Sequence, residues 1–472
     1  MKRAREDEVD SNDSKGAASE QIKSSARAAP VAARGPAISC SQREPFLPVA
    51  VDNATRSAVQ NLTLELVFGA ANVSSNTRRF LGERPELPGP LPISLSRRSL
   101  STSLLTHPYM VCEKSDGERN FLLTISKQTR DAPPGAYLID RSFKVQSLGA
   151  RSSEYSSFLS PNGPTLLDGE LVLRTDDAGT GTGARAVFYV FDCAYCNGVD
   201  LSGSGANLEH RLTYIRDGVR AKFTFADNTR LANGVLMLPL YICGKIMVDK
   251  TMVRTILDRV SEIRTASIAG EGSGTVNGSG KVTSPLLAPL ESELGVTSAS
   301  SSSHGSRHSH PTTLRMYRHD IRVNGTDGLI FTPVMSSFRQ LFDRESPAPL
   351  LKWKYVDEIT IDFELRRSAL QDADDKGKQS SLVPLFVAGF GQKLAHCEMS
   401  KDQVRAYDNL CGKLGEESII VECAFDAAFS RWEIRRIRDR KKRPNFITTA
   451  WSTLESVAEA LTAQELCSAF KH

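Results

Sequence analysis

The chain has 472 residues, of which 40% are hydrophobic, and its formal net charge is only +4. This length predicts two or three domains, and no apolar run approaches the ~20 residues that span a bilayer. The first ten residues lack the apolar core of a signal peptide, so we expect a soluble intracellular protein with reduced cysteines and no membrane partner.

Two segments are poor in the large apolar side chains that build a core. Residues 1–45 are rich in Ala, Ser, Arg and Glu, which predicts a disordered tail. Residues 265–312 are rich in Gly and Ser, which predicts a long insertion in a folded domain. We interpret its His304, His308 and His310 as part of a solvated loop. The insertion itself is either a passive loop or a phosphorylated or protein-binding segment.

Between these segments the sequence alternates β-type and helical patterns. Short runs of apolar residues predict strands at 121–126, 136–141, 165–174 and 186–193. Apolar residues at three and four spacing predict helices at 57–68 and 248–263. This mixture indicates an α+β fold with largely antiparallel strands.

A second β-rich region follows residue 354. Its apolar runs predict strands at 358–365, 382–388, 418–424 and 432–438. An amphipathic pattern at 449–470 then predicts a final helix. The chain is therefore expected to end in a small β domain followed by a helix.

The first candidate for chemistry is a lysine at the end of an apolar run. The sequence VCEKSDGERNFLL places Lys114, Asp116, Gly117 and Arg119 immediately before a predicted strand. A lysine fixed in this way can act as a nucleophile. K-x-D-G alone is a weak motif, so its meaning depends on the rest of the chain.

Carboxylates occur at similar positions in two later strands. TLLDGELVL carries Asp168 and Glu170, which share one strand face because they are two residues apart. TDGLIF carries Asp327 before another buried-type strand. The first pattern also fits an Asp-Gly turn followed by an exposed Glu.

Paired cations and a basic run come later. LLKWKYVDEITIDF places Lys352 and Lys354 on one strand face and Asp362 eight residues on, although solvated lysines would show the same pattern. RRIRDRKKR at 435–443 fits phosphate contact, a solvated basic face or a nuclear localisation signal. The C-x-x-C of Cys193 and Cys196 has no second pair to complete four ligands, so we interpret it as packing beside a strand.

Together these segments supply the parts of a phosphoryl-transfer site. They offer a nucleophilic lysine, carboxylate oxygens for Mg²⁺ or Mn²⁺, and ammonium groups for an α-phosphate. The ordered set KSDGER, YLIDR, LLDGELV, FYVFDC, TDGLIF, LLKWKYVDEITIDF and RIRDRKKRPN resembles the covalent nucleotidyltransferases, and among them the mRNA-capping guanylyltransferases. The resemblance extends from about residue 100 to 447.

The resemblance implies both a fold and a reaction. A nucleotidyltransferase domain at 46–354 would be followed by an OB-fold domain at 355–447 and a C-terminal helix at 448–472. Lys114 would attack the α-phosphate of GTP, form a covalent lysyl-GMP and pass GMP to the 5′-diphosphate end of RNA. A polynucleotide ligase acting through lysyl-AMP and a non-catalytic RNA- or polymerase-binding module of the same fold are the alternatives.

The resemblance also implies roles for residues around the nucleoside. Arg119 and Arg141 would contact the ribose, and Glu170 would lie at the sugar and the metal. Phe191 would stack on guanine, and Lys245 would reach its edge.

On the phosphate side, Asp327 would bind the metal, and Lys352 and Lys354 would hold the α-phosphate. Asp362, Arg438 and Lys441 would meet the β- and γ-phosphates. In this family an acid usually stands where this chain has Arg440, and the neighbouring Asp439 is the nearest substitute.

The family's biology implies further expectations about partners. An RNA triphosphatase, a cap methyltransferase and the tail of RNA polymerase II are the expected protein partners, because the sequence shows no motif for the first two activities. A nuclear location is compatible with the basic cluster at residues 2–5.

Overall fold

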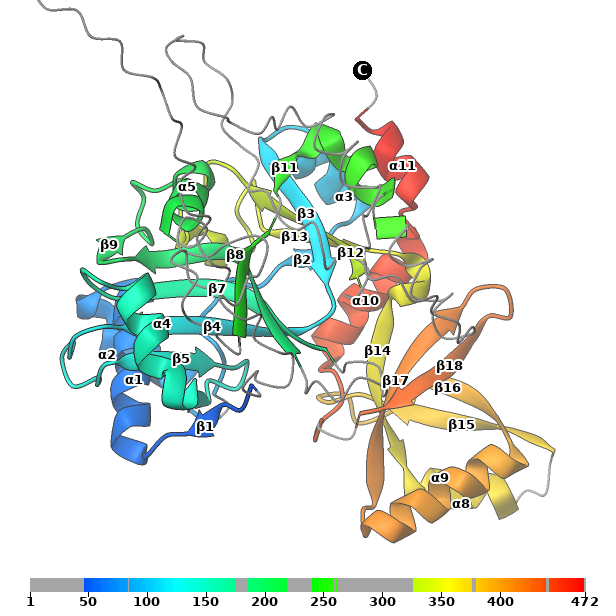
Figure 1. Ribbon diagram of the computed structural model, residues 1–472. Helices are drawn as coiled ribbons and strands as arrows, with labels where there is room; N and C mark the ends of the chain where they lie inside the picture. Colours follow the sequence, from blue (N-terminus) through cyan, green and yellow to red (C-terminus); the bar gives the residue numbers. More distant parts are fainter. Residues whose placement is uncertain are drawn as a thin grey trace, which may run out of the picture. The chain divides into compact units, whose positions relative to one another are not determined.

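A computed structural model describes residues 46–83, 85–174, 185–218, 240–245, 247–258, 260–261, 326–375, 379–438 and 441–470 (Figure 1). The predicted tail at 1–45 and insertion at 265–312 lie outside these residues. Within them, no helix combines the length and the apolar character that crossing a membrane requires. The described fold mixes helices with largely antiparallel sheets, as the sequence predicted.

The larger sheet has eight strands among the described residues, in the order β1-β6-β5-β4-β7-β8-β10, with β9 beside β8. Its neighbours are antiparallel except that β10 runs parallel to β8. Its strands are β1 (Val49–Ala50), β4 (Glu118–Ile125), β5 (Gly135–Ile139), β6 (Val145–Ser147), β7 (Thr165–Arg174), β8 (Arg185–Cys196), β9 (Val199–Asp200) and β10 (Leu240–Gly244). The four strands predicted in this region are confirmed.

Helices cover this sheet because their apolar faces match its apolar side chains. They are α1 (Asn53–Phe68), α2 (Val73–Phe80), α4 (Ser152–Leu159) and α5 (Leu208–Gly218). Asp52 caps α1 by accepting a hydrogen bond from the Thr55 amide, which fixes where the helix begins. Buried α1 residues such as Val59 and Leu62 join Phe121 and Leu123 of β4 in one hydrophobic cluster. The helix predicted at 57–68 is confirmed and begins one turn earlier.

A second sheet of five strands lies in the order β11-β3-β12-β13-β2 within the described part of the chain. Its strands are β2 (Ile93–Ser94), β3 (Tyr109–Ser115), β11 (Val248–Asp249), β12 (Thr326–Pro333) and β13 (Leu351–Lys354), and α3 (Arg97–Ser99) follows β2. The chain passes from β3 to β4, and therefore from one sheet to the other, through Asp116 and Gly117. This crossing places Lys114 where the two sheets meet.

The helix predicted at 248–263 is wrong over its first turn. Val248 and Asp249 instead form β11, which pairs with β3. Asp249 then accepts hydrogen bonds from the Thr251 amide and hydroxyl, and residues 253–258 are helical after a short 3₁₀ turn. The apolar spacing used for the prediction continues across Asp249, which caps the turn that follows it. Apolar periodicity alone does not detect such a cap.

The second β-rich region closes into a barrel in the order β14-β15-β16-β18-β17. The strands are β14 (Thr360–Arg366), β15 (Ser380–Phe386), β16 (Lys393–Ser400), β17 (Ser418–Asp426) and β18 (Arg431–Ile437), with helices α8 (Arg367–Asp375) and α9 (Lys401–Leu414). The four predicted strands are confirmed, while β16, α8 and α9 were not predicted. Ser400 and Gln403 cap α9 reciprocally, a signal present in the sequence.

The single helix predicted for the C-terminal segment is wrong, because the structure has α10 (Ile447–Glu459) and α11 (Ala463–Ser468). Ala460 adopts a left-handed conformation, φ 44°, which ends α10. Thr462 and Glu465 then form a capping box that starts α11. Leu461 and Leu466 are buried in the hydrophobic cluster of the second sheet, and the Trp353 indole donates to the Leu461 carbonyl at 2.8 Å.

Candidate active site

Lys114 lies in a cluster built by three adjacent strands of the second sheet. Strand β12 pairs with β3 and β13 on its two sides, and Gly328 is opposite both Lys114 and Lys354. The Asp327 carboxylate consequently accepts from Lys114 Nζ at 2.9 Å and from Lys354 Nζ at 2.5 Å. Lys114, which lies 213 residues from Asp327 in the sequence, therefore meets Lys354 at one carboxylate.

Gly328 allows this close approach of the strands. A Cβ atom there would lie 2.0 Å from the Trp353 carbonyl oxygen, a distance that no side chain can tolerate. Gly117 has a similar role beside β7, because a Cβ there would lie 2.7 Å from the Leu171 carbonyl oxygen. Close packing at the site therefore requires glycine at positions 117 and 328, each directly after an aspartate.

The charges of this cluster perturb two of its groups. Burial alone would raise the pKa of Asp327, but Lys114 and Lys354 outweigh it and lower that pKa. Burial, together with the neighbouring charges of Lys354 and Lys114, lowers the pKa of Lys352 to about 8. The cluster is therefore short of negative charge, as a site for phosphate would be.

Strands of the larger sheet supply the side of the site expected to bind the nucleoside. Arg119 on β4 donates from Nε to Asp168 on β7 at 2.9 Å, and its guanidinium carbon lies 5.5 Å from the centre of the Phe191 ring. Lys245 is buried and donates from Nζ to the Glu113 carbonyl at 2.9 Å. Its ammonium lies 6.0 Å from the centre of the same Phe191 ring. Two cations thus flank one aromatic ring.

Glu170 connects the two sides. It lies directly opposite Arg119 across the β4–β7 pair. Burial raises its pKa, while Lys245, Lys114 and Arg119 act against that rise through their charges. Glu170 is therefore within electrostatic range of both Lys114 and the cations around Phe191.

A polar cavity adjoins the lysine cluster and reaches the barrel. Its walls carry five cations, Arg141, Lys352, Lys354, Arg438 and Lys441, and one carboxylate, Asp362. Ser94 and the α10 hydroxyls of Thr449, Thr453 and Ser456 also line it. Arg141, which the family resemblance assigned to the ribose, lies on this cavity wall. Such a surplus of positive charge suits a polyphosphate.

Barrel residues of the cavity hold one another in place. Lys441 donates to Asp362, and Arg438 Nε lies 3.8 Å from the other oxygen of that carboxylate. The Asp362 amide donates to the Asn445 side-chain oxygen at 2.7 Å, and the Asn445 amide donates back to the Asp362 carbonyl at 2.8 Å. Asn445 was present in the quoted P-N ending but was not predicted as a site residue. Asp439 and Arg440 lie outside the described residues.

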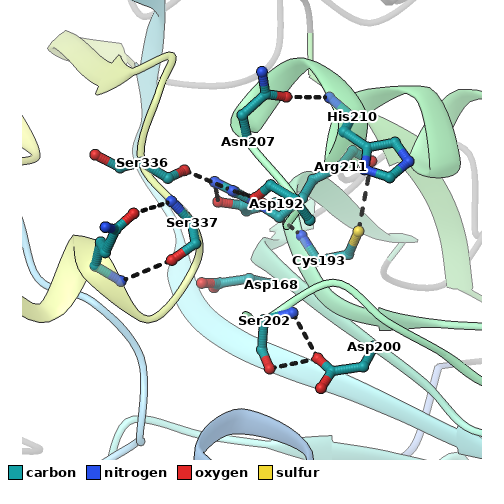
Figure 2. A network of polar contacts seen from close by, with 12 residues as sticks. Asp168, Asp192, Cys193, Asp200, Ser202, Asn207, His210, Arg211, Ser336 and Ser337 are labelled. Carbon is teal, nitrogen blue, oxygen red and sulfur yellow. Dashed lines mark hydrogen bonds and ion pairs between the residues drawn. The ribbon is translucent and has the colours of Figure 1, made fainter. Parts of the chain in front are cut away.

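A buried ion pair supports the strand that carries Phe191. Arg211 on α5 is fully buried and donates to Asp192 on β8 at 2.7 and 3.0 Å (Figure 2). The same guanidinium donates to the carbonyls of Ala206 and Ser336, each at 2.8 Å. Cys193 Sγ also lies 3.6 Å from the Arg211 carbonyl oxygen. Local sequence patterns do not predict this network, because Asp192 and its partner Arg211 lie on different elements.

We expect Asp192→Ala to lower the free energy of unfolding by about 3–5 kcal/mol, because Arg211 would remain buried without its counter-ion. Denaturant unfolding followed by circular dichroism measures this loss. Asp217→Ala is the matched control, since the Arg216–Asp217 pair on the same helix is largely exposed. The control should change stability by less than about 1 kcal/mol. Equal losses in the two variants would contradict the structural role of Asp192.

The carboxylates around Lys114 fit a divalent metal ion. Among the described residues no group of three or more His, Cys, Asp or Glu side chains gathers as a metal site. Mg²⁺, however, is commonly held by one or two carboxylates together with substrate phosphates. Asp327 and Glu170 provide two half-buried carboxylates whose charges interact with that of Lys114. The donor set therefore matches a metal that arrives with a nucleotide.

Comparisons with known proteins identify a family whose models match most of this chain. Residues 59–267 match the family model described as mRNA capping enzyme, catalytic domain, and residues 358–467 match mRNA capping enzyme, C-terminal domain. The mRNA-capping enzyme subunit alpha of Schizosaccharomyces pombe is 27% identical over 82% of this chain and 81% of its own length. That of Yarrowia lipolytica is 25% identical over 82% and 83%. A mycobacterial DNA ligase D complexed with ATP and MES aligns with 76% of this chain and 96% of its own length, at 14% identity and a TM-score of 0.30.

Proposed function

The chain belongs to the mRNA capping enzyme family, and from this we infer that it is an mRNA guanylyltransferase, which transfers GMP from GTP to the 5′ end of RNA. The resemblance found in its motifs is thereby confirmed, and the ligase alternative is disfavoured. The observation that carries the mechanism is the position of Lys114 beside Asp327 and Lys354, next to a cavity lined by cations.

We propose that Lys114 is the covalent residue. Its neutral amine forms a bond from Nζ to the α-phosphorus of GTP while the bond from that phosphorus to the β-phosphate oxygen breaks. Pyrophosphate leaves with the electron pair, and the amine loses its proton. Lys352 and Lys354 lie on the strand beside Asp327, where they stabilise the negative charge that develops on the phosphate. The product of this half-reaction is lysyl-GMP.

The second half-reaction transfers GMP to RNA. A terminal oxygen of the 5′-diphosphate RNA attacks the same phosphorus, the phosphorus–nitrogen bond breaks, and Lys114 regains its proton. The cavity cations Arg438 and Lys441, with Asp362, orient pyrophosphate in the first step and are free to release it before RNA binds. The position of Arg141 on the same wall favours a phosphate contact over the ribose contact expected from its motif.

The nucleoside would lie between the two sheets. Phe191 offers its ring face to guanine, Lys245 reaches the base edge, and Arg119 and Glu170 contact the ribose. Asp327 and Glu170 would hold Mg²⁺ or Mn²⁺, which neutralises phosphate charge when bound. The proposed domains that match these roles are a nucleotidyltransferase domain at 46–354 and an OB fold at 355–447. The closed five-stranded barrel supports the OB fold.

Labelled nucleotide tests this function directly. Incubation with α-labelled GTP and Mg²⁺ or Mn²⁺, followed by denaturing electrophoresis, should leave label on the protein, and 5′-diphosphate RNA should then remove it as a cap. Label from ATP alone would favour a ligase and overturn the proposal. Absence of label from either nucleotide would favour a non-catalytic binding module.

The perturbed Lys352 predicts a pH dependence of nucleotide binding. Because its pKa is about 8, its charge is present below that pH and is lost above it, so GTP binding should weaken by about tenfold per pH unit beyond about 8. Lys114→Arg, which keeps the local charge but cannot react, allows the dissociation constant to be measured by calorimetry between pH 7 and 9. Adding Lys352→Arg should abolish the inflection, because arginine stays protonated. An unchanged inflection in that double variant would assign it to another group.

Partners and location are proposals that follow from the reaction. The curated relatives are named as alpha subunits, which supports a second subunit, and we propose an RNA triphosphatase. A cap methyltransferase and the tail of RNA polymerase II complete the proposed partners, and the proposed location is the nucleus. Affinity purification of the full chain from nuclear extract, probed for triphosphatase activity, tests the first of these. Recovery of the chain solely in the cytoplasmic fraction would overturn the location.

A further inference from the structure

One carboxylate outside the predicted site bonds to the cations of the barrel wall. Glu422 on β17 accepts from Arg438 Nη1 at 2.9 Å and also from Arg436 Nε through the same oxygen. Its other oxygen accepts from the Thr360 hydroxyl at 2.8 Å. Glu422 thus accepts three side-chain hydrogen bonds, although it was not among the residues expected from the motifs.

The barrel register explains why these groups meet. Asp362 on β14 lies directly opposite Glu422, which in turn lies directly opposite Arg436 on β18. Directly opposed residues of antiparallel strands point to the same side of the sheet, and two carboxylates in this position repel each other. Arg438 lies between them, 2.9 Å from Glu422 and 3.8 Å from Asp362. The two acids therefore restrain this arginine from both sides.

The environment of Glu422 strengthens its hold on Arg438. The Glu422 side chain is only 14% exposed, whereas that of Arg438 is 32% exposed and lines the cavity. Burial alone would raise the pKa of Glu422, but hydrogen bonds from Arg436, Thr360 and Arg438 outweigh it and lower that pKa. An ionised, sheltered acid thus holds a more accessible cation by a charge-assisted hydrogen bond. The backbone assists, because the Arg438 amide donates to the Ile420 carbonyl at 2.8 Å.

We propose that Glu422, supported by Thr360, is a positioning residue that presents Arg438 to the pyrophosphate portion of the nucleotide. It does not touch the substrate, since Arg438 and Thr360 line the cavity and Glu422 does not. An unrestrained arginine would lose side-chain freedom each time it bound phosphate, and Glu422 removes that cost before the nucleotide arrives. This inference rests on the proposed function and adds a residue to it.

The reverse half-reaction isolates this role. Full-length protein is first converted to lysyl-GMP with excess labelled GTP, and the loss of label is then followed as a function of pyrophosphate concentration. We expect Glu422→Ala to raise the KM for pyrophosphate by about tenfold or more, and Glu422→Gln, which keeps one acceptor, by less. Transfer of GMP from the same adduct to 5′-diphosphate RNA should stay within about twofold of the wild type, because pyrophosphate has already left. Glu433→Gln, which alters another acid of the barrel, paired with Arg431, is the matched control and should change neither value.

A double-mutant cycle with Arg438→Ala distinguishes positioning from a structural effect. If Glu422 acts through Arg438, Glu422→Ala should have no further effect on the KM in the Arg438→Ala background. Additive effects, an equal slowing of RNA transfer, or a lower KM in Glu422→Ala would each overturn the inference. Should Glu422→Ala fail to fold, the Glu422→Gln cycle gives the same discrimination. Absence of label on the wild type is a separate outcome, which overturns the proposed function itself.

Discussion

Lys114→Ala leaves the protein without GMP after incubation with labelled GTP and metal. Two amines contact Asp327, that of Lys114 on β3 and that of Lys354 on β13. The variant lacks the first, and the second lies on the strand that pairs with the opposite side of β12. Tight binding of GTP cannot replace a missing nucleophile. The amount of label bound to the protein should therefore fall to background, not merely to a lower level. Denaturing electrophoresis of the labelled protein measures this directly.

The controls make this loss specific. Lys114 is partly exposed, and its removal leaves the ion pair between Asp327 and Lys354, so the variant should melt close to the wild type. Lys127→Ala, at an exposed lysine just after β4, should label normally. Persistent labelling of Lys114→Ala would assign the adduct to another lysine, and Lys354 would be examined next by peptide mapping.

Asp327→Asn should slow formation of lysyl-GMP by at least about a hundredfold, because it removes a charge that two separate functions need. The carboxylate pairs with Lys114 and Lys354 in the free protein and is a proposed ligand of the metal. The amide keeps its shape but not its charge. Single-turnover labelling at saturating GTP, repeated over a range of Mg²⁺ and Mn²⁺ concentrations, measures the effect.

A metal role predicts more than a slow rate for this variant. The metal concentration needed for half-maximal labelling should rise in Asp327→Asn, whereas Asp343→Asn, at an exposed acid further along the same segment, should match the wild type. A slow variant with an unchanged metal requirement would restrict Asp327 to orienting the two lysines. Unimpaired labelling would remove it from the site.

The sequence predicted the strands far better than their partners. Thr165–Arg174 was predicted with its observed bounds because its apolar run is long and ends in turn residues. The meeting of Lys114 with Asp327 depends on the register between β3 and β12, which lie over 200 residues apart, and only the family resemblance indicated it. Local patterns carry no information about such pairings.

Residues that act through other residues were the ones missed. Asp192 lies in FYVFDC but was given no role there, and Arg211 and Glu422 belong to none of the quoted motifs. Each of the three is defined by a partner on another element. Capping signals at Ser400 and Thr462 were readable in the sequence and would have predicted α9 and the break before α11. The remaining errors thus divide into local signals that were overlooked and contacts that only a fold can specify.

The return of the chain to the second sheet at Leu461 and Leu466 has a consequence for synthesis. These side chains share a hydrophobic cluster with Val111, Leu329 and Trp353, on the three strands that carry the lysines and Asp327. The ribosome synthesises those three strands before the barrel, and α11 after it. The hydrophobic core of the second sheet therefore stays incomplete while the barrel is synthesised. A chain truncated before residue 461 should therefore keep all the catalytic strands but lack the side chains of Leu461 and Leu466 that complete their hydrophobic core.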